Sequence, residues 1–199
     1  MTTSIAILAK APVPGYAKTR LIPSIGAHAA ARLQDAFTER TVKTALASQA
    51  GAVTLWCAPN PGHPSFVELG RNLSIVLKRQ PGGDLGERML AAMAGGPTVI
   101  LGTDCPALTP QHIAATAEAL QHADVVITPA DDGGYVLIGT RKPQPQLFAG
   151  IAWGGSSVMD ETRARMARLA LHCIEFEPLW DVDTEADLAR AESELAAIF

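Results

Sequence analysis

The sequence predicts a three-layer α/β/α sandwich around a mainly parallel sheet, and two observations support this. Short apolar runs recur along the 199 residues, and each is followed by a turn-rich loop and usually by a stretch with helical spacing of its apolar residues. Strands that alternate with helices in this way form parallel sheets with helices on both faces. The length suits one domain spanning residues 1–199, with a core that needs no disulfide or metal to hold it.

The predicted elements follow one another along the chain. Polar residues at capping positions, some with an acidic residue three positions later, mark where several of the helices begin. The predicted strands are Ser4–Ala9, Ala52–Cys57, Leu73–Leu77, Thr98–Gly102, Val125–Thr128, Tyr135–Gly139 and His172–Phe176. The predicted helices are Ala27–Ser48, one from Asp84 to Ala94, one from Thr109 and Pro110 to Gln121, one from Ser157 and Asp160 to Ala170, and a last one after Thr184 and Asp187 with Leu188, Ala191, Leu195 and Phe199 on one face.

Composition excludes several classes of protein. The net charge of -4 and the pI of about 5.7 argue against binding nucleic acid along a basic face. Three widely spaced cysteines (Cys57, Cys105 and Cys173) are typical of reduced thiols rather than of a disulfide framework. No apolar run reaches the length of about 18 residues that a membrane span needs, and the N-terminus lacks a signal-peptide core. We therefore expect a cytoplasmic protein without a membrane span.

Polar and glycine-rich loops follow the predicted strands. Ligands of open α/β sheets bind beyond the carboxyl ends of the strands, so these loops are expected to share one rim and form the site. They are Lys10–Arg20, Gln80–Met89, Thr103–Pro106, Asp131–Tyr135 and Asp181–Asp183.

The first loop carries three cations, Lys10, Lys18 and Arg20, around a turn stiffened by two prolines and opened by Gly15. Lysine serves phosphate as a point charge and arginine as a fork, so the loop is interpreted as a phosphate-binding segment. The alternative is a solvated loop whose cations offset nearby acids. The patterns of a P-loop and of a dinucleotide-binding turn are both absent.

The next two loops carry acidic residues with two interpretations each. In the second loop, Gly83, Asp84 and Arg88 are candidates for contacts to the nucleotide, although Asp84 also suits a helix cap. In the third, Asp104 follows a hydrophobic strand directly and is well placed to hold a hard divalent metal, although a turn aspartate would look the same. Cys105 is interpreted as a small buried residue.

The last two loops contribute paired carboxylates. Asp131 and Asp132 precede Gly133 and Gly134, an arrangement that suits a sugar hydroxyl or a metal-bound water, or only a tight turn. In the second pair, alternation along an extended segment puts Asp181 and Asp183 on the same side, where they could complete a metal site or favour the start of the last helix. None of the five histidines has the spacing of metal ligands.

Taken in order, these motifs resemble a bacterial family of proteins assigned as glycosyltransferases with the GT-A, nucleotide-diphospho-sugar-transferase fold. The family was long classed as a domain of unknown function, and some members are linked to arsenosugar biosynthesis. The same loop plan is similar to phospholactate guanylyltransferase and to the molybdenum-cofactor nucleotidyltransferases. The motifs are Ala9–Gly15 with Lys18–Leu21, Gly83–Met89, Gly102–Pro106, Asp131–Tyr135, Trp153 and Asp181–Thr184.

The resemblance implies a GT-A-like fold with Asp104 standing where such enzymes place a metal-binding aspartate. In the hypothesis of glycosyl transfer, Asp183 joins Asp104, and Mg²⁺ or Mn²⁺ is the cofactor because both accept oxygen ligands. Lys10, Lys18 and Arg20 would meet the phosphates of a nucleotide or nucleotide-sugar. Asp132 would act on an acceptor hydroxyl, and the loop from Asp131 with Gly133, Gly134 and Trp153 would contact a small-molecule acceptor or the sugar.

Three functions therefore remain open. The first is metal-dependent glycosyl transfer from a nucleotide-diphospho-sugar, in which Asp104 and Asp132 are the catalytic candidates. The second is nucleotidyl transfer from a nucleoside triphosphate, because Asp104 is followed by Cys105 and Pro106 rather than by the second aspartate of a D-x-D motif. The third is non-catalytic nucleotide binding.

Overall fold

The computed structural model describes residues 3–93 and 95–194, the side chains of 192–194 excepted. Its strands are β1 (Thr3–Lys10), β2 (Gly51–Ala58), β3 (Val76–Arg79), β4 (Thr98–Leu101), β5 (Val125–Pro129), β6 (Tyr135–Thr140) and β7 (Cys173–Glu175). Its helices are η1 (Thr19–Leu21), α1 (Ile22–Ile25), α2 (Ala27–Ala47), α3 (Pro64–Leu73), α4 (Leu85–Ala92), α5 (Pro110–Ala119), α6 (Pro145–Phe148), α7 (Val158–Arg168) and α8 (Glu185–Glu194).

The strands form one seven-stranded sheet in the order β3-β2-β1-β4-β6-β5-β7. Strand β6 runs antiparallel to both of its neighbours, and the other pairs are parallel. Every residue of β4 and β5 is buried, as is typical of strands covered on both faces. The predicted α/β fold with a mainly parallel sheet is confirmed.

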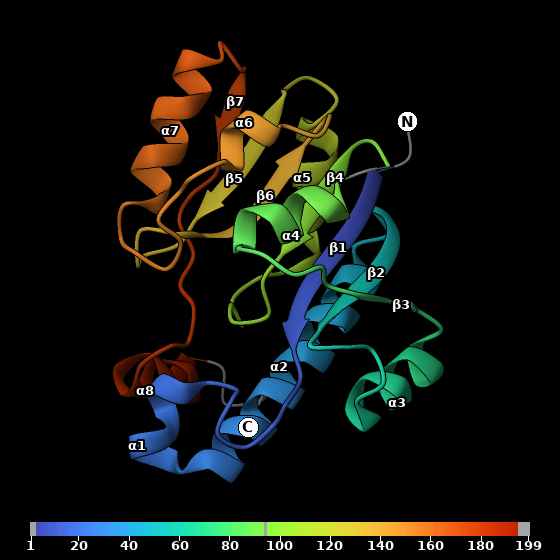
Figure 1. The fold of residues 1–199 in the computed structure, drawn as a ribbon, viewed down its shortest axis with the longest axis vertical. Coiled ribbons are helices and arrows are strands. Elements are labelled where there is room, and N and C mark those ends of the chain that lie inside the picture. The colour runs from blue at the N-terminus through green and yellow to red at the C-terminus, as the bar shows by residue number, and fades with distance from the viewer. Residues whose placement is uncertain (1–2, 94, 195–199) are drawn as a thin grey trace.

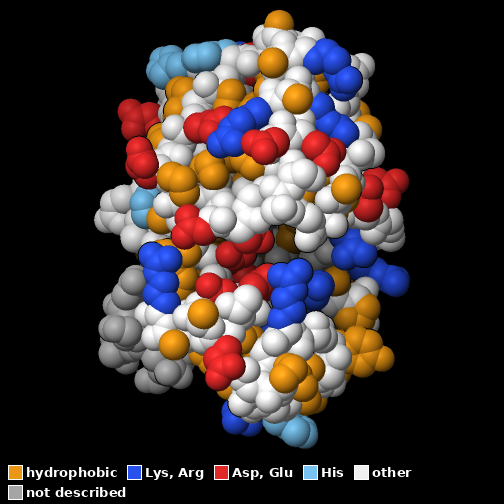
Figure 2. Space-filling view, turned by 90° about the vertical axis from the view of Figure 1, so that its left-hand side faces the viewer, with side chains coloured by type: hydrophobic (Ala, Val, Ile, Leu, Met, Phe, Trp, Pro, Cys, Tyr) orange, Lys and Arg blue, Asp and Glu red, His pale blue; other side chains and the backbone are white. Residues whose placement is uncertain are grey.

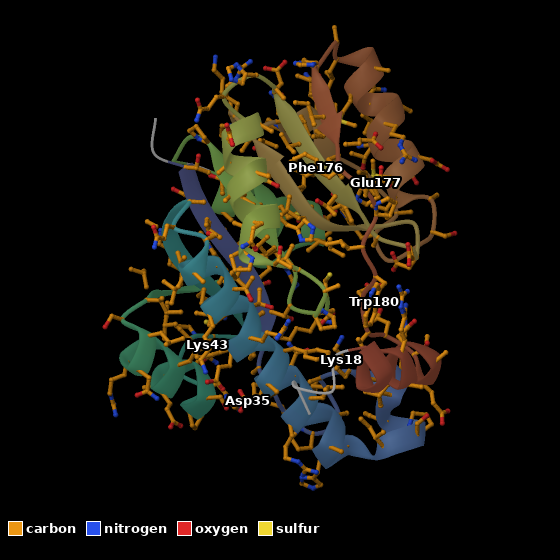
Figure 3. The ribbon with its side chains drawn as sticks, turned by 180° about the vertical axis from the view of Figure 1, so that it is seen from behind. Lys18, Asp35, Lys43, Phe176, Glu177 and Trp180 are labelled. Carbon is orange, nitrogen blue, oxygen red and sulfur yellow. The ribbon has the colours of Figure 1, made fainter. Side chains whose placement is uncertain are left out.

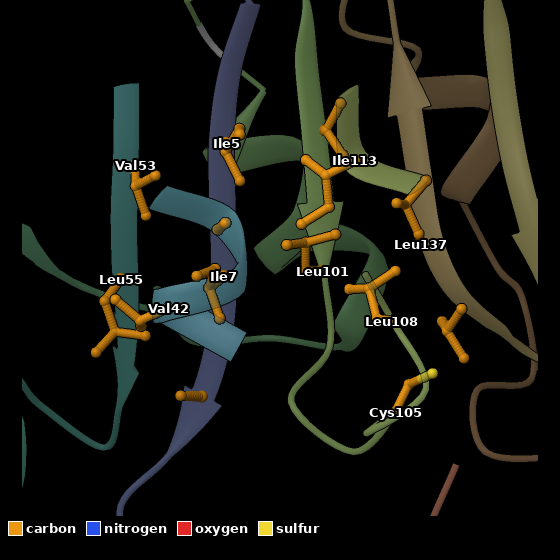
Figure 4. Packing of buried hydrophobic residues seen from close by; sticks show 14 of the residues in the cluster. Ile5, Ile7, Val42, Val53, Leu55, Leu101, Cys105, Leu108, Ile113 and Leu137 are labelled. Atoms are coloured by element: carbon orange, nitrogen blue, oxygen red, sulfur yellow. The ribbon is translucent and has the colours of Figure 1, made fainter. Parts of the chain in front are cut away.

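Helices cover both faces of the sheet (Figure 1). On one face, α4, α6 and α7 bury a cluster that includes Met89, Phe148 and Met159. On the other face, side chains of α2, α3 and α5 form a second cluster with residues of β1, β2 and β4. Figure 4 shows part of this cluster, with Ile5 and Ile7 of β1 beside Val53 and Leu55 of β2. The two clusters place the sheet in the middle of three layers.

A third, smaller apolar cluster lies beyond the carboxyl end of β1. It joins Leu21 of η1 and Phe37 of α2 to Trp180, Val182 and Leu188 from the C-terminal segment. Helices α1 and α8 lie side by side there, at the lower end of the molecule in Figure 1, and the Ser24 hydroxyl donates to Glu185 over 2.9 Å. The C-terminal segment is thereby held against the loop that follows β1.

Most predicted elements are present, with shifted ends. The third strand is Val76–Arg79 rather than Leu73–Leu77, because Leu73 ends α3, a helix that the sequence analysis did not predict. The capping boxes of Asp84 with Glu87 and of Thr184 with Asp187 are formed.

Two further details concern the predicted helices. The Ser157 hydroxyl donates to Glu161 instead of capping α7 with Asp160. Of the residues expected along one face of the last helix, Leu188 and Ala191 are buried, and Leu195 and Phe199 lie outside the described residues. Among the helices described, none has both the length and the apolar character needed to cross a bilayer.

Candidate functional site

A cavity of about 430 Å³ opens at the carboxyl ends of β1 and β4. Its lining comes from apolar side chains of β1, β4, α4 and β6, and from polar and aromatic residues of the loops and of α2: Lys10, Tyr16, Lys18–Arg20, Gln34, Gly102–Asp104 and Asp183. Figure 2 shows the hollow on this face, with carboxylates gathered beside it and Lys and Arg side chains to either side. The loops after β1 and β4 and the segment before α8 therefore share one rim, as the sequence predicts.

Lys18 is buried inside this rim, with a side chain that is only 3% exposed. Its Nζ lies 2.8 Å from Asp104 Oδ1 and 3.5 Å from Asp183 Oδ1, and donates to the carbonyl oxygen of Val182 over 2.6 Å. An ammonium group has three N–H donors, and these three oxygens occupy them. Figure 3 shows Lys18 near Trp180, where the segment after β7 reaches α8. Lys18 thus joins the loops after β1 and β4 to the C-terminal segment.

The other two cations of the first loop are exposed. Arg20 Nη1 lies 3.0 Å from Asp183 Oδ2, and the Arg20 side chain is 63% exposed. Because a guanidinium has five N–H donors, Arg20 keeps donors for a ligand while it holds Asp183. Lys10 is exposed at the end of β1 and lines the cavity. Of the predicted phosphate-binding cations, these two face the cavity with donors to spare.

Asp104 is oriented from two sides. Its Oδ1 meets Lys18 and also accepts from the Thr103 hydroxyl over 3.2 Å, and that hydroxyl in turn accepts from Gln34 Nε2 of α2 over 2.9 Å. Gln34 and Thr103 are both buried. The side chain of Asp104 is 41% exposed toward the cavity. Asp104 is therefore a fixed, cation-paired carboxylate on the cavity wall.

A second acidic group lies nearby and includes residues from two loops. One carboxylate oxygen from each of Asp132, Asp181 and Asp183 lies within 4.8 Å of the other two. Burial, and then the charges of Asp132 and Asp183, raise the pKa of Asp181 to about 6. Carboxylate oxygens at this spacing are suitable ligands for a hard divalent cation, which would neutralise the repulsion. Asp104, paired with Asp183 in the sequence analysis, is not a member of this group.

The loop between β5 and β6 places Asp132 by a tight turn. The Gly134 amide donates to Asp132 Oδ1 over 2.9 Å, and Gly133 has a left-handed φ of +91°. A Cβ atom on Gly133 would lie 2.2 Å from the carbonyl oxygen of Ser156, so only glycine fits against that segment. Asp131 instead turns to α8, where its carboxylate lies 3.5 Å from Arg190.

Three of the candidates after β3 serve the start of α4. Asp84 accepts from the Glu87 amide over 2.9 Å, and Arg88 Nε donates to the Gly83 carbonyl over 3.2 Å. A Cβ atom on Gly83 would lie 1.8 Å from the Glu87 carboxylate that completes the capping box. None of the three lines the cavity described above, whereas the next residue, Leu85, does.

Trp153 and Cys105 take part in the packing of the protein. Trp153 stacks on Phe148 and meets Tyr135 edge to face, with centroid distances of 6.5 and 6.4 Å, and is not among the cavity's lining residues. Gly86 allows this packing, because a Cβ there would lie 2.9 Å from the Trp153 ring. Burial raises the pKa of the Cys105 thiol to about 12, which removes it as a nucleophile.

Several residues that line or shape the cavity carry little or no local signal in the sequence. Gln34 lies on the face of α2 that also holds Phe37, and its bond to Thr103 spans 69 residues of sequence. Leu85 and Met89 looked like ordinary helix residues. Tyr16 had one visible signal, an aromatic residue in a Pro- and Gly-rich loop flanked by cations.

Solved structures with the same fold include enzymes of nucleotide chemistry. A protein of Desulfovibrio desulfuricans G20, provisionally assigned as a nucleotide-diphospho-sugar transferase, is 31% identical, with a TM-score of 0.86 over 98% of this chain and 89% of that one. A nucleotidyl transferase from Methanothermobacter matches at 16% identity over 100% and 99% of the two chains, with a TM-score of 0.66. The Mycobacterium tuberculosis protein Rv0371C, solved in complex with manganese, matches at 14% identity over 98% and 100%, with a TM-score of 0.56.

The last two likenesses concern the fold alone, whereas the first is a relationship in sequence over nearly the whole chain. No curated protein matches this chain. The family described as "Uncharacterized protein conserved in bacteria (DUF2064)" matches residues 41–155, more than half of the length. This chain belongs to that bacterial family and has the fold of the nucleotide-diphospho-sugar transferases and nucleotidyltransferases.

Proposed function

We propose that this protein is a metal-dependent glycosyltransferase that uses a nucleotide-diphospho-sugar as donor. The observation that carries the proposal is the meeting of exposed cations and clustered carboxylates at one cavity. Lys10 and Arg20 line the cavity at the end of β1, and Asp183 joins that lining to the acidic group. The negative charge of a diphosphate can be neutralised by cationic side chains and by a metal held on carboxylates.

Lys10 and Arg20 are assigned to the phosphates, and Lys18 to the support of the site. All donors of Lys18 have protein partners, whereas Arg20 is largely exposed and Lys10 lies at the cavity wall. This differs from the expectation that all three cations meet the phosphates.

Asp132, Asp181 and Asp183 are assigned as the metal ligands. The donor set fits Mg²⁺ or Mn²⁺, because it consists of carboxylate oxygens, and burial together with the charges of Asp132 and Asp183 raises the pKa of Asp181. Rv0371C, which shares the fold, was solved with manganese, and this supports the same choice here. When bound, the metal would neutralise charge on the departing diphosphate.

In glycosyl transfer, an acceptor hydroxyl oxygen bonds to the anomeric carbon of the sugar, the bond from that carbon to the phosphate oxygen breaks, and the nucleoside diphosphate leaves. Arg20 and Lys10 would stabilise the negative charge that develops on the diphosphate. Asp132 is assigned to the metal, and a carboxylate that binds a divalent cation is a weak base, so the proton of the acceptor hydroxyl is released to solvent water. The likeness to the Desulfovibrio protein supports this reaction over others.

Nucleotidyl transfer is the second candidate, favoured by one observation. The chain places a single aspartate, Asp104, after β4, and a lysine rather than a second aspartate is its partner. In this reaction a substrate phosphate attacks the α-phosphorus of a nucleoside triphosphate, and pyrophosphate leaves. The solved structure of a Leptospira cytidylyltransferase shares the fold at 13% identity.

Product analysis by ³¹P NMR separates the candidates. The protein is incubated with Mn²⁺ and either nucleotide-diphospho-sugars or nucleoside triphosphates, with a panel of sugar and phosphorylated acceptors. Release of a nucleoside diphosphate supports glycosyl transfer, and release of pyrophosphate supports nucleotidyl transfer. Binding without either product would make the protein a nucleotide-binding protein and contradict the proposal.

Two substitutions make the assay specific. Asp183→Asn should abolish turnover, because it removes a metal ligand and the partner of Arg20. Asp160→Asn is the matched control, because Asp160 is exposed on α7 and lies outside the cavity. Equal loss of activity in both variants would remove the support for this site.

A further inference from the structure

Tyr16 is the most exposed large hydrophobic side chain in the part of the chain that the structure describes, at 78%. Leu85 is another exposed one, at 41%, and both line the same cavity from different elements. Tyr16 comes from the loop after β1 and Leu85 from the first turn of α4. Exposed apolar surface gathered at a cavity is typical of a binding site.

The backbone under Tyr16 is firmly held although its ring is exposed. The amides of Tyr16 and Ala17 both donate to the carbonyl oxygen of Val13, over 3.0 and 3.1 Å. Gly15 supplies the left-handed turn with a φ of +88°, and Ala17 is fully buried. Two residues on, Lys18 is anchored by its three oxygen partners. The ring therefore projects from a preorganised platform.

The charged side chains near Tyr16 indicate which kind of ligand its ring would contact. Lys10 and Arg20, assigned above to the phosphates, line the same cavity and lie in the same loop as Tyr16. A nucleotide bound through its diphosphate presents a planar aromatic base within a few bonds of those phosphates. Stacking on an aromatic side chain is a common way for a protein to hold a base, and it does not depend on base identity.

We propose that Tyr16 is the stacking partner of the donor's nucleobase. This inference rests on the proposed function, because it takes the cavity as the nucleotide site. Leu85 would cover the ligand from the side of α4. The phenol oxygen is not needed for stacking, so the ring itself carries the effect.

The test compares a ligand with a base and one without. The affinities of ADP, CDP, GDP, UDP and inorganic pyrophosphate are measured by titration calorimetry with Mn²⁺ present. For the tightest nucleoside diphosphate, Tyr16→Ala should weaken binding by about 5- to 100-fold, the range found for loss of one base–aromatic stack. Pyrophosphate binding should change by less than about twofold, since charge alone holds that ligand.

Three further variants sharpen the test. Tyr16→Phe should keep the affinity, because the ring remains. Tyr16→Trp should give an exposed fluorophore quenched by the nucleoside diphosphate and not by pyrophosphate. Val76→Ala is the control, because Val76 is also an exposed apolar residue, at 56%, but lies on the edge strand β3 outside the cavity.

The outcomes separate this inference from the proposed function. If Tyr16→Ala leaves the affinity for nucleoside diphosphates unchanged, the stacking role is overturned. It is also overturned if Tyr16→Ala weakens the binding of nucleotide and of pyrophosphate equally. In both cases Lys10→Met should still weaken the binding of nucleoside diphosphate and of pyrophosphate, and the assignment of the cavity as a nucleotide site would be kept. If the wild-type protein binds neither class of ligand, both the inference and the proposed function are overturned.

Discussion

Two acidic regions lie close together at the carboxyl ends of the strands, and they are balanced differently. Asp104 is paired with the buried Lys18 at 2.8 Å. In the group of Asp132, Asp181 and Asp183, three carboxylates crowd together and the pKa of Asp181 is raised to about 6. The first region has a buried cation built into it, whereas in the second only Asp183 has cation partners among the described residues, Lys18 and the exposed Arg20.

This difference in charge balance assigns different roles to the two regions: the first supports the structure of the site, and the second binds the metal. A carboxylate whose partner is a buried ammonium is part of the framework, since removing either one leaves a costly unpaired charge. A group of carboxylates that repel one another gains most from an added cation. Asp183 belongs to both regions, because its Oδ1 faces Lys18 at 3.5 Å and its Oδ2 meets Arg20. It couples the framework to the site.

The largest effect is expected from Lys18→Met, which removes the cation of the first region. Breaking a buried ion pair destabilises a protein by about 3–5 kcal/mol. Because Asp104 is partly exposed, we expect a loss near the lower end, about 3 kcal/mol. At roughly 2–4 °C per kcal/mol for a chain of this size, the melting temperature should fall by about 6–12 °C. Thermal unfolding followed by circular dichroism measures this.

Lys43→Met provides the matched control. Lys43 pairs with Glu39 on the surface of α2, where both side chains are more than half exposed, and Figure 3 labels it on that helix. Such surface pairs contribute about 0–1 kcal/mol. Similar melting temperatures for the two variants would show that Lys18 is not the supporting cation.

A smaller effect is expected from Gly133→Ala, which displaces the loop that carries Asp132. The left-handed backbone costs an alanine about 1–2 kcal/mol, and its Cβ would clash with the Ser156 carbonyl. Stability and Mn²⁺ affinity should therefore fall together. Gly82→Ala is the control, because no atom lies within 4 Å of its Cβ position and its φ is not left-handed. Unchanged metal binding in Gly133→Ala would remove Asp132 from the ligand set.

A further prediction concerns how the stability of the protein depends on pH. The folded-state pKa of Asp181 is raised from 3.8 to about 6, so the folded protein binds that proton more tightly than the unfolded chain does. Without metal, the contribution of Asp181 to stability should therefore fall as pH rises from about 4 to 6 and stay low above that. Asp181→Asn should raise the melting temperature at pH 7 and leave it unchanged near pH 4.

Asp124 gives the opposite sign and serves as the comparison. Its hydrogen bond from Arg141 lowers the pKa of that carboxyl, so its contribution to stability is present above the usual aspartate range and is lost at acid pH. Asp124→Asn should therefore lower the melting temperature at pH 7. If, without metal, Asp181→Asn also lowered the melting temperature at pH 7, the Asp181 carboxylate would not be destabilised by burial and by the neighbouring carboxylates.

The fold was predictable because its signals are local. Apolar runs marked the strands, and the capping residues Asp84, Thr109 and Thr184 marked three helix starts. Helix α3 was missed although Phe66, Leu69 and Leu73 recur at helical spacing, because its ten residues follow a segment rich in Pro and Gly and contain Gly70. Its last residue, Leu73, was taken as the start of a strand for the same reason.

The site was less predictable because its contacts are distant in sequence. The pairing of Lys18 with Val182 and Asp183 spans more than 160 residues, and no local pattern indicates it. Spacing did predict that Asp181 and Asp183 face the same way, and they do share one group. Trp153 and Asp84 were candidates for ligand contacts because polar or aromatic residues in loops look alike whether they bind a ligand or complete a cap or an apolar cluster.

The most direct test is Mn²⁺ binding to the protein, measured by the electron paramagnetic resonance of free Mn²⁺ for the wild type and single Asp→Asn variants. The account predicts that Asp181→Asn and Asp183→Asn each weaken binding by about tenfold or more, since each loses one charged oxygen ligand. Asp104→Asn should change the affinity by less than about threefold, since that carboxylate is already balanced by Lys18. Loss of Mn²⁺ binding in Asp104→Asn together with full binding in Asp181→Asn would contradict the account.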